Sequence, residues 1–291
     1  METTPAARLR ALLQGLRVAQ GVGAGDALTA RLIERAGFDF VWASGFCMSA
    51  AAALPDASLI TMGDVLEATR RMVEAVQIPV LADCDTGFGN AVNVIHTVQR
   101  FERAGAAGIC LEDKQFPKDT SLLEGGRQHL APAAEFAGKV RAAKDAQRAG
   151  DFVVVARVEA LIAGWGHEEA LARAEQYAEA GADAVLIHSK ARTPDEIVAF
   201  ARHWDGRAPL VLVPTNYPSL TAASAAELGH VRLLIYANQP LRAAVQSQEH
   251  LLAEIRRAGG VHTVGDLLCP VPHIFELQGV PQMKEQERRY S

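Results

Sequence analysis

The 291-residue sequence lacks several patterns that mark whole classes of proteins. It has only four cysteines, Cys47, Cys84, Cys110 and Cys269, and they form no CxxC pair. Because this spacing does not fit a disulfide-rich scaffold, we expect reduced thiols in a cytoplasmic protein. The segment 1–5 has an early acid and no apolar core, which does not fit a secretory signal peptide.

Basic charge and long apolar runs are also scarce. The formal net charge is −5, from 29 basic and 34 acidic residues, and we find no basic stripe for a nucleic acid. No uninterrupted apolar run reaches the about 18 residues that a membrane helix needs. The glycine-rich segment Gly21–Asp26 lacks the GxGxxG spacing of a nucleotide-binding loop, so we expect a turn in which Asp26 caps the following helix. We expect neither a nucleic acid nor a membrane as partner.

One pattern repeats along the chain: a short apolar run, a turn, and a longer alanine-rich amphipathic stretch. Almost wholly apolar strands that alternate with helices predict a parallel sheet covered by helices. Eight such units favour a closed (β/α)8 barrel of the TIM type over an open doubly wound sheet, and we expect a single domain over residues 1–291. The expected strands are Arg17–Gln20, Phe38–Ala43, Pro79–Asp83, Gly108–Glu112, Phe152–Arg157, Ala184–His188, Leu210–Val213 and Arg232–Tyr236.

Polar side chains stand at the carboxyl ends of several expected strands. In a barrel these ends meet at one mouth, where active sites form, whereas an open sheet would spread them along an edge. The barrel therefore also explains the polar pattern. The residues are Asp83, Asp85, Glu112, Arg157, Glu159 and His188.

The carboxylates predict a cation site. Asp83 and Asp85 follow one expected strand, and Glu112 and Asp113 follow the next. Four carboxylates in a small volume would repel one another without a cation, and a hard divalent ion that keeps some of its waters, Mg²⁺ or Mn²⁺, suits them. The alternative is that the aspartates only cap helices and form turns.

Three further features suit an anionic ligand. Arg157 fits bidentate recognition of carboxylate or phosphonate oxygens, with a structural ion pair as the alternative. His188 either donates a hydrogen bond to a substrate or is a satisfied core residue. The backbone N–H groups of the segment 42–46 can cradle an anion, or the segment is an ordinary tight turn.

Two segments fall outside the simple repeat. The loop of about 114–132 is long for a connection between a strand and a helix, and long loops in compact domains tend to be lids or binding loops. We therefore expect it to gate the site. The tail segment of about 261–278 carries Ile274, Phe275 and Leu277 near its end, so an apolar helix there needs a surface to cover, which we expect on another subunit.

From about Arg17 to Leu277 the sequence resembles the isocitrate lyase and phosphoenolpyruvate mutase superfamily. The segment 162–166, Ile-Ala-Gly-Trp-Gly, resembles its phosphonate-processing branch in particular. The resemblance implies a barrel whose last helix is swapped between paired subunits, a homotetramer built as a dimer of such dimers, and a magnesium-bound 2-oxo acid. The motifs that carry it are Trp-Ala-Ser-Gly at 42–45, Asp-Cys-Asp-Thr-Gly-Phe-Gly-Asn at 83–90, Leu-Glu-Asp-Lys at 111–114, Ala-Arg-Val-Glu-Ala at 156–160 and His-Ser-Lys at 188–190.

The resemblance also implies a role for each matching position. For the metal it implies Asp83 as ligand, with Asp85 and Glu112 in the shell through water. Near the reacting atoms it implies a conformationally important Asp56. For the substrate it implies that Trp42, Ser44, Gly45 and Phe46 bind the carboxylate end and its surroundings, and that Ser121, Arg157 and His188 face a phosphonyl group.

The expected gating loop distinguishes the branches of the superfamily. Carbon–carbon lyases carry a Lys-Arg-Cys-Gly-His type of segment there, whereas residues 116–122 contain no cysteine, which argues against an isocitrate or methylisocitrate lyase. Lys118 and Ser121 resemble the phosphonate branch, but the mutase has asparagine where this chain has Thr120. A shorter threonine frees space, and its hydroxyl can orient a water molecule.

The resemblance thus implies hydrolysis of the carbon–phosphorus bond of phosphonopyruvate to pyruvate and inorganic phosphate. Arg157, His188 and Lys118 would stabilise the charge of the departing phosphoryl group, and a metal would stabilise the pyruvate enolate. Phosphoenolpyruvate mutase activity is the first alternative. Oxaloacetate decarboxylase or acetylhydrolase activity comes next, and a phosphonate-binding protein without catalysis is the alternative from another class.

Overall fold

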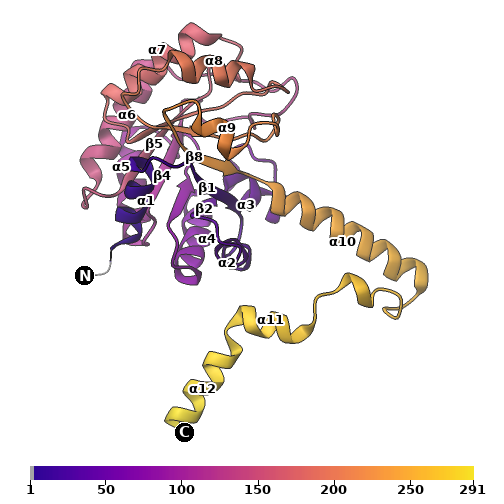
Figure 1. Ribbon diagram of the computed structural model, residues 1–291. Helices are drawn as coiled ribbons and strands as arrows, with labels where there is room; N and C mark the ends of the chain where they lie inside the picture. Colours follow the sequence, from indigo (N-terminus) through magenta and orange to yellow (C-terminus); the bar gives the residue numbers. More distant parts are fainter. Residues whose placement is uncertain (1–2) are drawn as a thin grey trace. The chain divides into compact units, whose positions relative to one another are not determined.

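The computed structural model describes residues 3–291 (Figure 1). By its internal contacts the chain divides into two compact units, of which the first extends to Gln239 and the second comprises Pro240–Ser291. The assignment of both units to one domain stays a prediction.

The first unit is a closed barrel of eight parallel strands in sequential order, in which β1 pairs with both β2 and β8. The expected TIM-type barrel is therefore confirmed, and apart from β1 the strand boundaries differ from the expected ones by at most two residues. The strands are β1 (Ala19–Ala24), β2 (Phe40–Ala43), β3 (Val80–Asp83), β4 (Gly108–Glu112), β5 (Val153–Val158), β6 (Ala184–Ile187), β7 (Leu210–Leu212) and β8 (Val231–Tyr236).

Alternating side chains along the strands form two apolar clusters, because successive residues of a strand point to opposite faces. Phe40, Leu81 and Val155 belong to the interior cluster, which also takes Leu9 and Leu13 from α1. The other strand residues pack outward against the surrounding helices. The helices of the first unit are α1 (Pro5–Gln14), α2 (Ala27–Arg35), α3 (Gly45–Ala51), α4 (Met62–Ala75), α5 (Ala91–Arg103), α6 (Ala133–Ala146), α7 (His167–Glu179), α8 (Asp195–His203) and α9 (Ala222–Ala226).

The second unit consists of helices with much exposed apolar surface. Its main elements are α10 (Gln239–Ala258, which starts at the boundary), α11 (Val271–Gln278) and α12 (Val280–Tyr290). No residue of α10 is buried, and Val271 and Phe275 of α11 are exposed. Within the expected tail segment only its end forms an α-helix, and α12 follows beyond it. The swap between subunits stays a prediction. Within residues 3–291, every helix is too short or too polar to cross a membrane.

The first strand corrects the sequence prediction. The segment Gly21–Asp26 was expected to be a turn, but β1 continues through it to Ala24. A β-carbon at Gly21 would lie 2.3 Å from the ring of Phe40, and one at Gly23 only 1.8 Å from the carbonyl oxygen of Ala237. The glycines therefore allow close packing inside a strand rather than a reversal of the chain. The expected cap is confirmed, since the Asp26 side chain accepts a hydrogen bond from the Thr29 N–H.

We expect Gly23→Ala to lower the free energy of unfolding by about 1–3 kcal/mol, because overpacking forces backbone shifts. The added methyl group would meet a backbone carbonyl of the segment after β8, which cannot rotate away as a side chain can. Urea titration followed by circular dichroism measures the change. Gly150→Ala is the matched control, since nothing lies within 4 Å of its β-carbon position. Equal stability of the two variants would contradict the packing role.

Candidate active site

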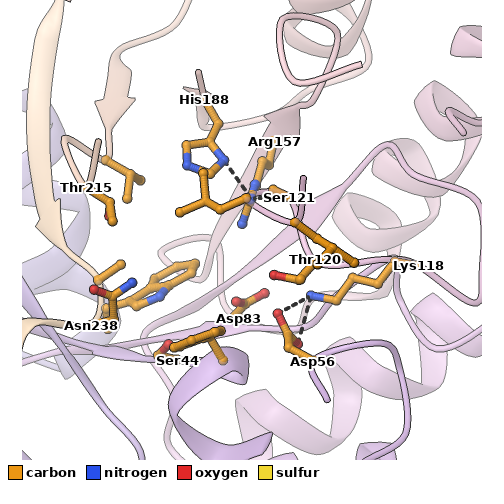
Figure 2. Close-up of a pocket in the computed structure, with 16 residues that line it drawn as sticks. Ser44, Asp56, Asp83, Lys118, Thr120, Ser121, Arg157, His188, Thr215 and Asn238 are labelled. Atoms are coloured by element: carbon orange, nitrogen blue, oxygen red, sulfur yellow. Dashed lines mark hydrogen bonds and ion pairs between the residues drawn. The ribbon is translucent and has the colours of Figure 1, made fainter. Parts of the chain in front are cut away.

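A pocket of ≈ 320 Å³ lies at the carboxyl ends of the barrel strands (Figure 2). It brings together side chains from β2, β3, β5 and β6 and from the loop 114–132, as the barrel predicts for strand ends. The lining residues singled out from the sequence are Trp42, Ser44, Phe46, Asp56, Asp83, Lys118, Thr120, Ser121, Arg157 and His188. Asp83 lies centrally in Figure 2, with Arg157 and His188 on one side and Asp56 with Lys118 on the other.

Three buried carboxylates, Asp83, Asp85 and Glu112, come from the ends of β3 and β4. The Lys118 ammonium lies 2.6 Å from Asp85 Oδ1 and 3.7 Å from Glu112 Oε1. Burial raises the pKa of Asp83 to about 7, although Lys118 acts in the opposite direction. Burial likewise raises the pKa of Asp85, which stands at a φ of 50°. The cluster therefore holds more negative charge than its buried position favours, and a cation would stabilise it.

The donor set fits a hard divalent cation. Both carboxylate oxygens of Glu112 are buried and have no hydrogen-bond partner among residues 3–291. In that range no group of three His, Cys, Asp or Glu side chains converges closely enough to hold a metal directly. Mg²⁺ commonly binds one or two carboxylates and keeps several waters, so direct contact with all three side chains is not required.

Asp113 is not part of this cluster, which corrects the expected set of four carboxylates. Its Oδ2 accepts hydrogen bonds from the Tyr177 hydroxyl at 2.7 Å and from Arg173 Nη1 at 3.0 Å, and its Oδ1 accepts one from the Glu159 N–H at 2.9 Å. Asp113 follows Glu112 directly, so its side chain leaves the chain toward α7 rather than toward the pocket. It joins α7 to the loop after β5.

The segment 42–46 is a strand end followed by a helix rather than a tight turn. Ser44 caps α3, and its Oγ accepts a hydrogen bond from the Cys47 N–H. Gly45 lies beside the carboxylates, because a β-carbon there would be 3.3 Å from Asp83 Oδ2. The first N–H groups of α3 and the Asp83 carboxylate are thus neighbours at the pocket.

Arg157 is both an ion-pair partner and a pocket residue, so the two readings of its role coexist. Its Nε donates to Glu159 Oε1 at 2.5 Å, and its Nη2 lies 2.8 Å from His188 Nδ1. His188 Nδ1 also lies 3.2 Å from Glu159 Oε1, to which it can donate only in the other tautomer. The shorter contact is with a guanidinium, which can only donate, and this favours Nδ1 as acceptor and the proton on Nε2. Burial and then Arg157 lower the pKa of His188, which favours the neutral ring. Its Nε2–H remains as a donor for a ligand.

The Ser121 hydroxyl is fully used within the protein. It donates to Glu159 Oε2 at 2.6 Å and accepts hydrogen bonds from Lys114 Nζ at 2.7 Å and from Arg157 Nη2 at 2.9 Å. A hydroxyl has one proton and two lone pairs, so none is left for a phosphonyl group. In the structure Ser121 holds Arg157 in place, and the expected contact of Ser121 with a substrate stays a prediction.

Sequence reasoning missed several pocket residues. The amide oxygen of Asn238 is buried and has no hydrogen-bond partner among residues 3–291. Thr215 lies three residues beyond β7 and Asn238 two residues beyond β8, so the tendency of polar residues to gather after the carboxyl ends of strands is the sequence signal for both. The missed residues are Leu122, Leu123, Val213, Thr215, Ala237 and Asn238.

Comparison with known proteins gives consistent matches. A sequence model of the phosphoenolpyruvate phosphomutase family matches residues 9–256. The phosphonopyruvate hydrolase of Variovorax sp. (strain Pal2) is 52% identical, and the alignment covers 97% of both chains. A crystal structure of a phosphonopyruvate hydrolase in complex with oxalate and Mg²⁺ superposes with a TM-score of 0.94 at 50% identity, covering 99% of both chains.

The crystal structure of a phosphoenolpyruvate phosphomutase from Streptomyces platensis subsp. rosaceus superposes equally well. Its TM-score is 0.95 at 47% sequence identity, and the superposition covers 98% of this chain and 99% of the other. The matches extend over the barrel and the helical second unit alike. This chain therefore belongs to the phosphoenolpyruvate phosphomutase family.

Proposed function

We propose that this protein hydrolyses the carbon–phosphorus bond of phosphonopyruvate, giving pyruvate and inorganic phosphate. The observation that carries the proposal is Thr120 at the pocket, on a loop without cysteine and beside Arg157 and His188. The similarity to a phosphonopyruvate hydrolase over nearly the whole chain supports it. The mutase reaction shares the first half of this chemistry and is the alternative that the experiments must exclude.

The two ends of the pocket suit the two ends of this substrate. The Ser44–Phe46 backbone at the start of α3 and the nearby Asp83 suit the carboxylate and ketone end of the substrate. In our proposal Asp83 would hold a divalent cation, Mg²⁺, and Asp85 and Glu112 would reach this cation through water. Arg157 and the His188 Nε2–H suit the phosphonyl oxygens. When bound, the cation supplies positive charge that stabilises the pyruvate enolate.

In the reaction, a water oxygen forms a bond to phosphorus while the carbon–phosphorus bond breaks. The electron pair of the broken bond passes into the enolate of pyruvate, which then takes a proton at carbon 3. The phosphoryl group in flight is metaphosphate-like and spreads charge over its equatorial oxygens. Arg157 is positioned in advance by Glu159 and Ser121 and needs no rearrangement to stabilise this charge.

Lys118 was expected to stabilise the departing phosphoryl group, but in the structure its ammonium group pairs with carboxylates of the protein. It pairs with Asp56 at 3.2 Å and with Asp85 at 2.6 Å, on the carboxylate side of the pocket (Figure 2). From there it neutralises part of the buried negative charge and joins the loop to the barrel. We propose that Lys118 and Asp56 shape the side of the pocket from which water approaches, with Thr120 between them and Arg157.

The direct test of this function follows pyruvate and inorganic phosphate together during incubation with phosphonopyruvate and Mg²⁺. We expect equal release of both products and loss of both with EDTA. Phosphoenolpyruvate in place of phosphate would establish the mutase instead. No turnover of phosphonopyruvate, with decarboxylation of oxaloacetate, would overturn the proposal.

Thr120→Asn is expected to lower phosphate release by about tenfold or more while substrate binding changes little, because a larger amide fills the space of the attacking water. Binding is followed through KM and through inhibition by oxalate. Thr193→Asn is the matched control, since Thr193 is exposed and does not line the pocket. Unchanged turnover in Thr120→Asn would remove Thr120 from the mechanism.

We further propose a homotetramer in which α11 and α12 of one subunit cover a partner in a helix-swapped pair, and a cytoplasmic location. The exposed Val271 and Phe275 on α11 support the first part. Sedimentation analysis tests it, because removal of residues 261–291 should then yield smaller species.

A further inference from the structure

Lys114 is a buried lysine that lies outside the pocket. It lies two residues after the end of β4 and begins the loop 114–132, and its side chain is only 1% exposed. It does not line the pocket, so it touches neither substrate nor cation in the proposed reaction. A buried ammonium is costly unless it is paired, so its partners indicate what it does.

Those partners lie on both sides of Thr120. Lys114 Nζ donates to the carbonyl oxygen of Asp119 at 2.8 Å and to the hydroxyl of Ser121 at 2.7 Å. The third partner is Glu159 on the barrel, whose Oε2 lies 3.2 Å away and whose side chain is fully buried. Lys114 thus ties the residues before and after Thr120 to one fixed carboxylate.

Other contacts of the loop near Thr120 are of two kinds. Asp119 accepts a hydrogen bond from the Arg127 N–H, and the Thr120 carbonyl oxygen accepts one from Gln128, but these partners belong to the same loop. Lys118 reaches the barrel, yet it does so through pocket carboxylates. The remaining support is Glu159, which Ser121 Oγ reaches directly at 2.6 Å and Lys114 Nζ reaches at 3.2 Å, so Lys114 reinforces a link between loop and barrel that Ser121 also makes.

The charge of Glu159 makes the link strong. Although burial opposes ionisation, Arg157 and Lys114 hold the pKa of Glu159 well below its ordinary value. The carboxylate is therefore ionised; it accepts hydrogen bonds from Arg157 and Ser121 and forms an ion pair with Lys114. The same carboxylate orients the arginine and the loop, so the two parts of the phosphoryl site share one support.

We propose that Lys114 is a positioning residue that, through Glu159 and Ser121, holds Thr120 over the pocket and couples the closed loop to Arg157. The inference rests on the proposed function, because it assigns Thr120 a place in the reaction. A displacement of about 1 Å at such a site can cost on the order of 100-fold in rate.

The test uses Lys114→Met in the full chain, assayed with phosphonopyruvate and Mg²⁺. We expect kcat to fall by about 10–100-fold while KM changes much less, since Lys114 makes no substrate contact. Trypsin cleavage at Arg127 should become faster, because the loop keeps the Ser121 contact with Glu159 but loses the support of Lys114 on both sides of Thr120. Lys144→Met is the matched control: it removes an ion pair with Asp183, next to the amino end of β6, and should leave kcat and loop cleavage unchanged.

Lys114→Gln is a second variant, in which a neutral amide can still donate hydrogen bonds. We expect its kcat and its rate of trypsin cleavage to lie between those of the wild type and of Lys114→Met. If Lys114→Met does not fold, the same two measurements on Lys114→Gln decide. Folded variants with wild-type kcat and wild-type loop cleavage would overturn the inference. The protease measurement needs no turnover, so it separates a failure of this inference from inactivity of the wild-type protein toward phosphonopyruvate, which would contradict the proposed function instead.

Discussion

Asp83→Ala is expected to abolish metal-dependent turnover of phosphonopyruvate. Asp83 is the carboxylate that lines the pocket beside Gly45, and burial together with Asp85 already raises its pKa. Loss of the cation forfeits several kcal/mol of charge stabilisation in the transition state, which corresponds to a fall in kcat of about 1,000-fold or more. Steady-state kinetics over a range of Mg²⁺ concentrations measures the effect.

The control for this prediction is Asp39→Asn. Asp39 precedes β2 at the amino end of the barrel, where it pairs with Arg17. We expect its variant to keep wild-type kcat and Mg²⁺ dependence. Full Mg²⁺-dependent activity in Asp83→Ala would sink the assignment of the cation site.

Arg157→Met is expected to lower kcat by about 1,000-fold, because a positioned arginine is worth that much or more in phosphoryl transfer. The effect should fall mainly on kcat, since the charge that Arg157 stabilises develops in the transition state. Oxalate has two adjacent carbons that bear oxygens, as the pyruvate enolate has, but no phosphonyl group, so we expect its affinity to change much less. Kinetics and isothermal titration with oxalate in the presence of Mg²⁺ separate the two effects.

Removal of Arg157 also leaves the buried Glu159 with less positive charge around it, so stability must be followed alongside. The double variant Arg157→Met with Glu159→Gln removes that charge and should be equally inactive. Arg10→Met is a control that breaks an ion pair with Asp183, near the start of β6. Turnover within tenfold of wild type in the folded Arg157 variants would contradict the role of the guanidinium.

The barrel could be predicted from the sequence because its determinants are local. The strands are short apolar runs between alanine-rich amphipathic stretches, and β4 agrees with the expected boundaries at both ends. The prediction for β1 was wrong because glycine is needed at positions 21 and 23 for close packing against Phe40 and Ala237, and these contact residues are distant in the sequence. Propensity alone assigns such glycines to turns.

The candidate site was predictable to the extent that its residues stand at strand ends. Asp83, Glu112, Arg157 and His188 were found in this way, and Asp56, Lys118 and Thr120 came from the family resemblance. The direction in which each side chain points was harder to predict from the sequence. Adjacent residues of a strand point to opposite sides, so Glu112 and Asp113 do not share one cluster.

The supporting residues could not be assigned from the sequence. Glu159 was noticed at a strand end, but its contacts with Arg157, Ser121 and Lys114 depend on how the loop folds back over the barrel. The same fold engages the hydroxyl of Ser121 with Lys114, Glu159 and Arg157, whereas the family resemblance implies a contact with the substrate. Hydrogen-bond saturation is a property of the folded site and has no signature in residue spacing.

In the proposed reaction water, rather than the enolate oxygen, takes the phosphoryl group in this pocket. A time course by ³¹P nuclear magnetic resonance tests it most directly, because it resolves phosphonopyruvate, phosphoenolpyruvate and inorganic phosphate in one sample with Mg²⁺. We expect the phosphate signal to grow as phosphonopyruvate disappears, without a phosphoenolpyruvate signal at any time. A phosphoenolpyruvate signal that accumulates to equilibrium would contradict it and identify the protein as a mutase.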